Sequence, residues 1–223
     1  MADPDTDPTA PPLLRAVEVM DRLRSPGGCP WDAEQTHRSL AKYLLEETYE
    51  TLEAIETDDL ALLREELGDL LLQVLFHSRL AEELPPGQRF SIDDVAGDLV
   101  TKLVHRHPHV FGDVSVSGVD ELNANWERLK AAEKGRTSLV EGVPMSQPAL
   151  ALAAKLVSRA QRAGVDVPSA GDGFGDRLLA LVREAVAAGV DPEFALRETA
   201  RAASCSGDRF SHFHRSVARW KSR

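Results

Sequence analysis

Two leucine-rich segments joined by a short linker constrain the fold of this 223-residue chain more than any other feature. Residues 37–56 and the segment from residue 60 to about residue 83 both repeat apolar side chains at helical spacing, so each predicts a long amphipathic helix. Residues 57–59 between them offer an N-cap for the second helix. Because such a short connection joins neighbours, we expect the two helices to pack as an antiparallel hairpin.

The rest of the sequence also predicts helices. Residues 13–24 precede the hairpin, and Ser91 followed by Asp94 predicts a capped helix over residues 92–106, which Pro108 ends. Further helical patterns cover residues 119–134, 147–163, 175–188, 193–203 and 208–220. Only 5% of the residues are aromatic although 43% are hydrophobic, so the core must consist mainly of Leu, Val and Ala. No pair of strands joined by a turn is recognisable, and we expect an all-α helical bundle.

Acidic side chains occur in pairs on the two helices of the predicted hairpin. Glu47 and Glu50 are three residues apart on the first helix, and Glu66 and Asp69 are three apart on the second, so each pair shares a helix face. Packing of the hairpin would bring all four carboxylates together. Two such charges about 5 Å apart repel by roughly 3 kcal/mol at an effective dielectric constant near 20. A divalent cation would reverse this repulsion, and oxygen-only ligands suit Mg²⁺ or Mn²⁺.

These glutamates have two other interpretations. Glutamate is a good helix former, so pairs at this spacing are also common on solvated helix faces. A di-iron carboxylate bundle would need Glu-x-x-His pairs. Neither helix has a histidine three residues after its glutamates. The oxygen-only set therefore favours magnesium over iron, while the solvated face remains an alternative.

Charge and terminal sequence argue against several classes of protein. The formal net charge of −10 argues against a nucleic-acid-binding surface, although metal ions can still mediate binding of an acidic nucleotide. Cys29 and Cys205 make no disulfide framework, which indicates a reducing, cytoplasmic compartment. Residues 1–12 are acidic and rich in proline and lack the features of a signal peptide, so we expect a disordered leader. No apolar run approaches the ~20 residues that span a membrane, and no membrane partner is expected.

Five motifs occur in order between residues 13 and 145. They are GCPWD-x-EQT, LLEETYE, EELGDLLLQVLFH, KLVHRHPHVFGD and NWERLKAAEK. In this combination the chain resembles MazG, a family of all-α nucleoside triphosphate pyrophosphohydrolases. The resemblance implies a magnesium-dependent enzyme that cleaves a nucleoside triphosphate, canonical or non-canonical, to the monophosphate and pyrophosphate, and so cleans the nucleotide pool.

The same resemblance assigns residues to the expected site. It implies that Glu47, Glu50, Glu66 and Asp69 bind Mg²⁺, for which Mn²⁺ is a substitute, and that Glu46 orients a water molecule or a metal ligand. The triphosphate and the base would contact a second set of residues, namely Lys102, Arg106, Trp126, Lys130 and Trp31. Cationic side chains compensate phosphate charge, and a tryptophan face stacks on a nucleobase without strong selectivity.

The second set of residues also has structural interpretations. Lys102 and Arg106 share one helix face, which also suits a solvated basic surface. Trp126 suits a core position, and Trp31 suits packing under the hairpin as well as a base pocket. The three histidines of HRHPH would form a zinc site only with a further ligand that is not assigned.

The second half of the chain departs from the pattern of the first half. Residues 68–74 (GDLLLQV) align with residues 175–181 (GDRLLAL), which indicates a second repeat, but no acidic helix occurs between residues 161 and 175. Asp176 therefore lacks the partners of Asp69. We expect a leader over residues 1–12, a catalytic helical domain over 13–145, and a degenerate second repeat over 146–223 that is kept for packing or oligomer contacts.

The expected chemistry is an in-line attack of an oriented water on phosphorus, while metal ions neutralise the developing charge. Lys102, Arg106 and Lys130 would steady the departing pyrophosphate. The apolar helix faces exceed what one short hairpin covers, so we expect at least a homodimer. Two alternatives are a non-catalytic nucleotide sensor or interaction module with the same fold, and a narrow-substrate relative such as a dUTP or phosphoribosyl-ATP hydrolase. The CPWD and W-x-x-x-K motifs favour MazG over the latter.

Overall fold

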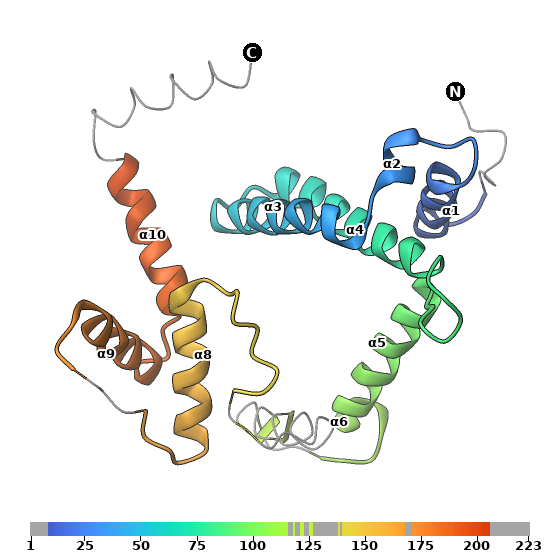
Figure 1. Ribbon diagram of the computed structural model, residues 1–223. Helices are drawn as coiled ribbons and strands as arrows, with labels where there is room; N and C mark the ends of the chain where they lie inside the picture. Colours follow the sequence, from blue (N-terminus) through green and yellow to red (C-terminus); the bar gives the residue numbers. More distant parts are fainter. Residues whose placement is uncertain are drawn as a thin grey trace. The chain divides into compact units, whose positions relative to one another are not determined.

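Helices are the only regular elements in the part of the chain that the structure describes, which confirms the all-α prediction. This computed structural model describes residues 9–115, 118, 121–122, 125–126, 138, 140–167 and 171–205. The chain divides into two compact units, Met1–Glu127 and Arg128–Arg223 (Figure 1). Among the described residues, no helix combines the length and the apolar character needed to cross a membrane.

The two longest helices form the predicted antiparallel hairpin. α3 (His37–Glu56) and α4 (Leu60–Ala81) pack along each other (Figure 1). Thr36 and Ser39 form a capping box at the start of α3. Asp59 caps α4 by accepting hydrogen bonds of 3.0 Å from two main-chain N–H groups. Both helices therefore begin and end within two residues of the predicted positions.

Two shorter helices cover the second half of α4. α1 (Pro12–Arg24) and α2 (Pro30–Glu34) pack on each other, and α1 packs on α4. The α2 helix was not predicted, because one turn is too short to show a periodic pattern; Pro30 stands at its first position, where a missing N–H costs nothing. The core of this unit joins α1, α3 and α4, and consists of Met20, Leu40, Leu75, Phe76 and Leu80.

Gly28 sets the path of the chain between α1 and α2. A Cβ at this position would lie 2.3 Å from the carbonyl oxygen of Leu23 and 2.4 Å from that of Arg22. The next N–H, of Cys29, donates a hydrogen bond of 2.7 Å to the same Leu23 oxygen. Only glycine fits this close approach of backbone to backbone, which explains the glycine that opens the GCPWD motif.

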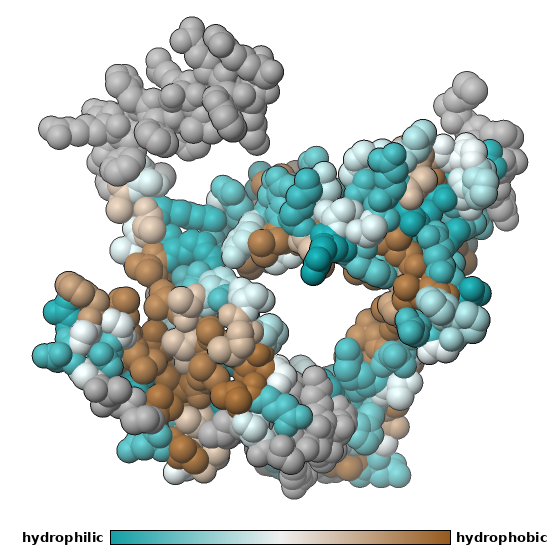
Figure 2. Space-filling model, viewed as in Figure 1, coloured by the Kyte–Doolittle hydropathy of each residue, from teal (hydrophilic) through white to brown (hydrophobic). Residues whose placement is uncertain are grey.

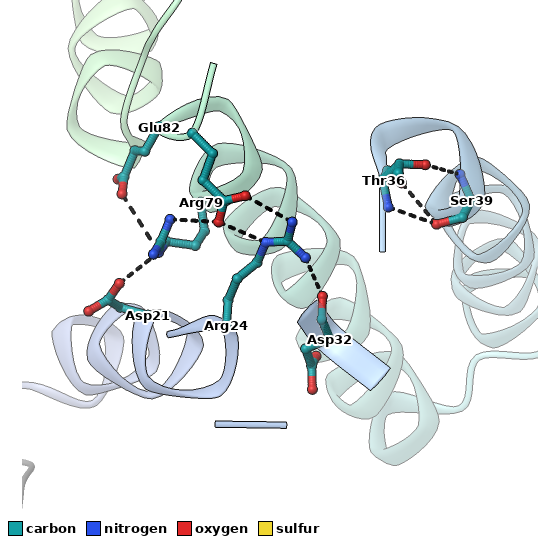
Figure 3. A network of polar contacts seen from close by, with 8 residues as sticks. Asp21, Arg24, Asp32, Thr36, Ser39, Arg79 and Glu82 are labelled. Atoms are coloured by element: carbon teal, nitrogen blue, oxygen red, sulfur yellow. Dashed lines mark hydrogen bonds and ion pairs between the residues drawn. The ribbon is translucent and has the colours of Figure 1, made fainter. Parts of the chain in front are cut away.

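An ion-pair network ties the end of α1 to α2 and to the end of α4 (Figure 3). Arg24, whose side chain is only 8% exposed, donates to both carboxylate oxygens of Glu83 at 2.9 Å, and also to the main-chain oxygen of Asp32. Arg79 donates to Asp21 at 2.6 Å and to Glu83 at 3.1 Å. The hydrogen bond from Arg24 lowers the pKa of Glu83 below its ordinary value. The network fixes the angle at which α1 meets α4.

The helix that follows the hairpin leads away from it. α5 (Ile92–Arg106) begins with the predicted Ser91–Asp94 capping box, and its start packs on the end of α4. The four-residue helix α6 (Pro108–Phe111), which was not predicted, starts at Pro108. No residue of α5 is buried, and its apolar face lies exposed at Leu99, Val100, Leu103 and Val104. Of the helix predicted over 119–134, only residues 121–122 and 125–126 are described, and these are helical.

Among its described residues, the second unit contains three mutually packed helices. α8 (Ala149–Arg162), α9 (Phe174–Ala187) and α10 (Pro192–Cys205) lie within two residues of the predicted ranges. Figure 2 shows apolar side chains gathered over α8 and α9. A groove of about 300 Å³ between the helices is lined mainly by apolar residues, among them Leu150, Leu178, Leu181, Val182 and Leu196. The helix predicted over 208–220 lies outside the described residues.

Candidate metal centre

Three carboxylates of α3 and α4 meet on the facing sides of the hairpin. One oxygen from each of Glu47, Glu66 and Asp69 lies within 4.8 Å of the other two. Glu66 is only 7% exposed, and Glu47 and Asp69 are half-buried. The antiparallel packing of the two helices thus brings Glu47 together with Glu66 and Asp69, which lie 19 and 22 residues further along the sequence.

Local structure explains why these carboxylates point inward. On α3 the buried positions Leu40, Thr51 and Ala54 mark the side that faces α4, and Glu47 falls on the same side at helical spacing. The Thr51 hydroxyl donates to the main-chain oxygen of Glu47 at 2.8 Å. Acidic residues therefore occupy positions in the helix interface where an ordinary hairpin would carry apolar ones.

The carboxylates of the cluster destabilise one another's charged forms. Burial raises the pKa of Glu47 above its ordinary value, and repulsion from Asp69 together with a hydrogen bond to Glu50 raises it further. Burial also raises the pKa of Glu66, with added repulsion from Glu50, Asp69 and Glu65. Glu50, although exposed, therefore acts electrostatically on both helices. Such shifts indicate a lack of compensating positive charge.

The ligand set of this cluster fits a hard divalent cation. All its donors are carboxylate oxygens, the type preferred by Mg²⁺, Mn²⁺ and Ca²⁺ rather than by zinc or copper. A cation would also remove the repulsion that raises the two pKa values. Within the described residues, this is the one group of three or more acidic, histidine or cysteine side chains close enough to hold a metal. The histidines of the HRHPH segment form no such group there.

Glu46 lies outside the cluster. It precedes Glu47 directly on α3, so its side chain projects from a different side of the helix. Its side chain is exposed. The structure therefore separates Glu46 from the group of Glu47, Glu66 and Asp69.

The predicted substrate residues of α5 do not reach the acidic cluster within one chain. α5 packs on the end of α4, whereas Glu66 and Asp69 lie in its first half, and α5 then runs away from the hairpin (Figure 1). Lys102 and Arg106 lie in the last part of α5. Trp126 is 43% exposed and packs against His107, with ring centroids 5.7 Å apart. Lys130 lies outside the described residues.

Trp31 combines packing with exposure. Its ring makes edge contacts with Tyr43 at 5.9 Å and with Phe76 at 6.4 Å between centroids. The side chain is nevertheless 49% exposed. These contacts support the packing interpretation, and the contact with a base stays a prediction.

A line of polar side chains on α4 continues from the acidic cluster toward the end of the helix. It was not predicted from the sequence. Gln73 is 4% exposed and its Oε1 atom has no hydrogen-bond partner. One turn further, Nδ1 of His77 lies 2.8 Å from Nδ1 of His37 on α3. Burial lowers the pKa of His77, and the neighbouring His37 lowers it further. The spacing of residues 66, 69, 73 and 77 in steps of three and four is the signal that would have revealed this line.

Comparisons with known proteins cover the part of the chain that holds this cluster. The family described as MazG nucleotide pyrophosphohydrolase domain matches residues 35–111. The chain is 58% identical over 191 residues to an uncharacterized 26.1 kDa protein of Streptomyces cacaoi, covering 84% of this chain and 78% of that one.

Two relatives named as nucleoside triphosphate pyrophosphohydrolases match as well. The chain is 54% identical over 153 residues to a nucleoside triphosphate pyrophosphohydrolase of Mycobacterium tuberculosis, covering 69% of this chain and 46% of the relative. It therefore spans about half the length of that relative. It is 39% identical over 210 residues to a nucleoside triphosphate pyrophosphohydrolase/pyrophosphatase MazG of Thermotoga maritima, covering 83% of this chain and 80% of that one.

Proposed function

The chain belongs to the MazG family of nucleotide pyrophosphohydrolases, and from this membership we propose that it hydrolyses nucleoside triphosphates to the monophosphate and pyrophosphate. The observation that carries the proposal is the acidic cluster of Glu47, Glu66 and Asp69, which lies within the segment that matches the family. The same resemblance supports a role in cleaning the nucleotide pool, and the cysteine usage supports a cytoplasmic location for it.

Magnesium is the proposed cation, held by Glu47, Glu66 and Asp69 with Glu50 as a fourth ligand. The all-oxygen donors and the mutual repulsion of the carboxylates support this choice. Bound there, the cation would neutralise phosphate charge and lower the pKa of a water molecule. Manganese, which accepts the same oxygen ligands, would substitute.

The remaining side chains would bind and orient the reactants. Glu46, the exposed residue that precedes Glu47 on α3, would orient the attacking water. Lys102, Arg106 and Lys130 would bind the pyrophosphate group that leaves, because cations offset its charge. The exposed faces of Trp31 and Trp126 would stack on the base.

A homodimer would complete the site. In one chain α5 carries Lys102 and Arg106 away from the acidic cluster, and its exposed apolar face lacks a covering element among the described residues of its unit. Leu44, Leu45 and Leu67 on the hairpin are also exposed. Packing of two copies through these faces would bury apolar surface and present α5 of one copy to the hairpin of the other. Sedimentation equilibrium is expected to show a dimer.

Pyrophosphate release from a panel of nucleoside and deoxynucleoside triphosphates tests the proposal. We expect release with Mg²⁺ or Mn²⁺, none with a chelator, and none from the Glu47→Gln variant. Glu53→Gln, which changes an exposed glutamate of the same helix outside the cluster, is the matched control and should keep full activity. Full activity of Glu47→Gln would contradict the proposal, and nucleotide binding without any release would identify a non-catalytic sensor instead.

A further inference from the structure

Gln73 is a buried polar side chain that the proposed chemistry does not use. It lies in the second half of α4 with 4% of its surface exposed, and its Oε1 atom has no partner. An unpaired buried acceptor has lost its hydrogen bonds to water without gaining a replacement, which destabilises the folded state. Buried polar groups in native proteins nearly always find a protein, water or ion partner. A leucine would fill a similar volume without this penalty, so the amide calls for a functional explanation.

The position of Gln73 on α4 relates it to the acidic cluster. Glu66, Asp69 and Gln73 follow one another at spacings of three and four, so they share one side of the helix, and Gln73 lies one turn beyond Asp69. Helical side chains lean toward the N-terminus of their helix, which directs Gln73 toward the turn that carries Asp69. Like Glu66, Gln73 is buried on the side of α4 that packs against α3.

The neighbours of Gln73 on this face do not supply the missing donor. The carboxylates of Asp69 and Glu66 accept hydrogen bonds when ionised and have none to donate. On the other side, His77 directs its Nδ1 atom at His37, and its buried Nε2 atom makes no hydrogen bond to Gln73 or to any other described residue. The two imidazole rings are parallel to within 1°, and their Nδ1 atoms are 2.8 Å apart. Their centroids are 5.1 Å apart, so the centroid distance exceeds the Nδ1 distance by about one ring diameter. The rings therefore lie edge to edge, and Nδ1 of His77 is committed to His37 on α3.

We propose that Gln73 is a positioning residue whose amide oxygen accepts a hydrogen bond from a water of the hydrated cation in the acidic cluster. The inference rests on the cation site of the proposed function. Mg²⁺ gives up its water reluctantly, so a protein site holds it through some carboxylates and several remaining waters. Those waters are donors and need acceptors. A neutral amide four residues beyond Asp69, a rise of about 6 Å along the helix axis, offers such an acceptor without adding a further negative charge to four carboxylates.

Direct measurement of Mg²⁺ binding in the 223-residue chain without nucleotide tests this role. Calorimetry of Gln73→Leu should show a dissociation constant raised by about 10- to 100-fold, the usual cost of removing a group that supports metal ligands. The same variant should unfold without Mg²⁺ at the wild-type temperature or above, because an unpaired polar group is removed. Gln73→Glu keeps an acceptor and should bind Mg²⁺ at least as tightly as the wild type. Ser78→Ala removes a buried polar side chain from another side of α4 and should leave Mg²⁺ affinity unchanged.

Three results would overturn the inference, and they are distinguishable. If Gln73→Leu binds Mg²⁺ as tightly as the wild type while Asp69→Asn does not, Gln73 has no role at the cation, and the proposed function stands. If Gln73→Leu dissociates in sedimentation experiments with unchanged Mg²⁺ affinity, the amide belongs to a subunit interface. If the wild type binds no Mg²⁺, the cation site of the proposed function fails, and this role fails with it.

Discussion

The sequence GD-x-LL occurs in both units of the molecule and has a different structural role in each. Asp69 lies inside α4, half-buried beside Glu47 and Glu66. Asp176 lies in the first turn of α9, and its carboxylate folds back on the preceding loop, 3.2 Å from the point where a Cβ of Gly173 would lie. A carboxylate there is favoured by the partial positive charge of the helix N-terminus. The same short sequence therefore starts a helix in one unit and contributes to an acidic cluster in the other.

The helix that precedes each motif accounts for the difference. α3 provides Glu47 and Glu50 to face α4, and the linker between the two helices is short enough to hold them side by side. α8, which packs against α9, contains no acidic residue. A motif of this kind thus indicates a metal site only when the helix packed against it carries further acidic residues. The degenerate second repeat stays a prediction that rests on sequence alone.

The largest expected effect separates the two aspartates. Asp69→Asn should lower pyrophosphate release by more than about 100-fold, because it removes a charged ligand of the proposed cation. Asp176→Asn, the matched change in the second unit, should leave turnover unchanged and lower thermal stability slightly through the loss of a favourable helix-end charge. Steady-state assays at saturating nucleotide compare the two. Equal losses in both variants would show that the second unit takes part in catalysis.

Much of the fold was predictable, because the signals that place these helices are local. Residues 57–59 and the pair of Ser91 and Asp94 mark helix starts in the sequence, and the structure confirms a cap at each, with Asp59 as the capping residue of the first. The direction of α5 was not predictable, since it depends on tertiary contacts at the end of α4. Gln73 was missed for a related reason, because burial, which only the packed structure shows, distinguishes it from a solvated glutamine.

Core substitutions should have the next largest effect and should distinguish the two units by stability. Leu40, 1% exposed, packs in the core of the first unit, and Leu40→Ala should cost about 2–5 kcal/mol of unfolding free energy. Val182, 2% exposed in the second unit, is a smaller side chain, and Val182→Ala should cost less. Urea denaturation measures both. A Val182→Ala loss that equals or exceeds the Leu40→Ala loss would show that the second unit limits the stability of the chain.

Magnesium should stabilise the first unit selectively. A cation at ten times its dissociation constant stabilises the folded state by about 1.4 kcal/mol, and this gain should vanish in Asp69→Asn but persist in Asp176→Asn.

Without the cation, the raised pKa values of Glu47 and Glu66 should make the stability of the first unit depend on pH. Folded-state pKa values above the unfolded value mean that ionisation costs stability, so the metal-free unit should lose stability as the pH rises above about 4.5, the ordinary value for glutamate. Thermal unfolding across pH with Mg²⁺ or a chelator measures this, and a metal-free profile that is flat above that pH would show that the carboxylates do not repel one another.

The smallest expected effect comes from ion pairs, and here too the two units differ. Glu83 joins α1 to α4 through Arg24, whereas Glu193 pairs with Arg197 at 3.1 Å within α10 alone. Glu83→Gln should lower the free energy of unfolding by about 1 kcal/mol or less, because Glu83 is 42% exposed. Glu193→Gln should lower it by about 0.3–0.5 kcal/mol, as is usual for pairs four residues apart on a helix. Because the pKa of Glu83 is lowered in the folded state, its contribution is present above the unfolded pKa and is lost as the pH falls through the folded value. Urea denaturation between pH 7 and pH 3 measures the free energy of unfolding of both variants and of the wild type. The difference between Glu83→Gln and the wild type should shrink at the acidic end. A difference that grows on acidification would rule out an ion pair as the source of the stabilisation.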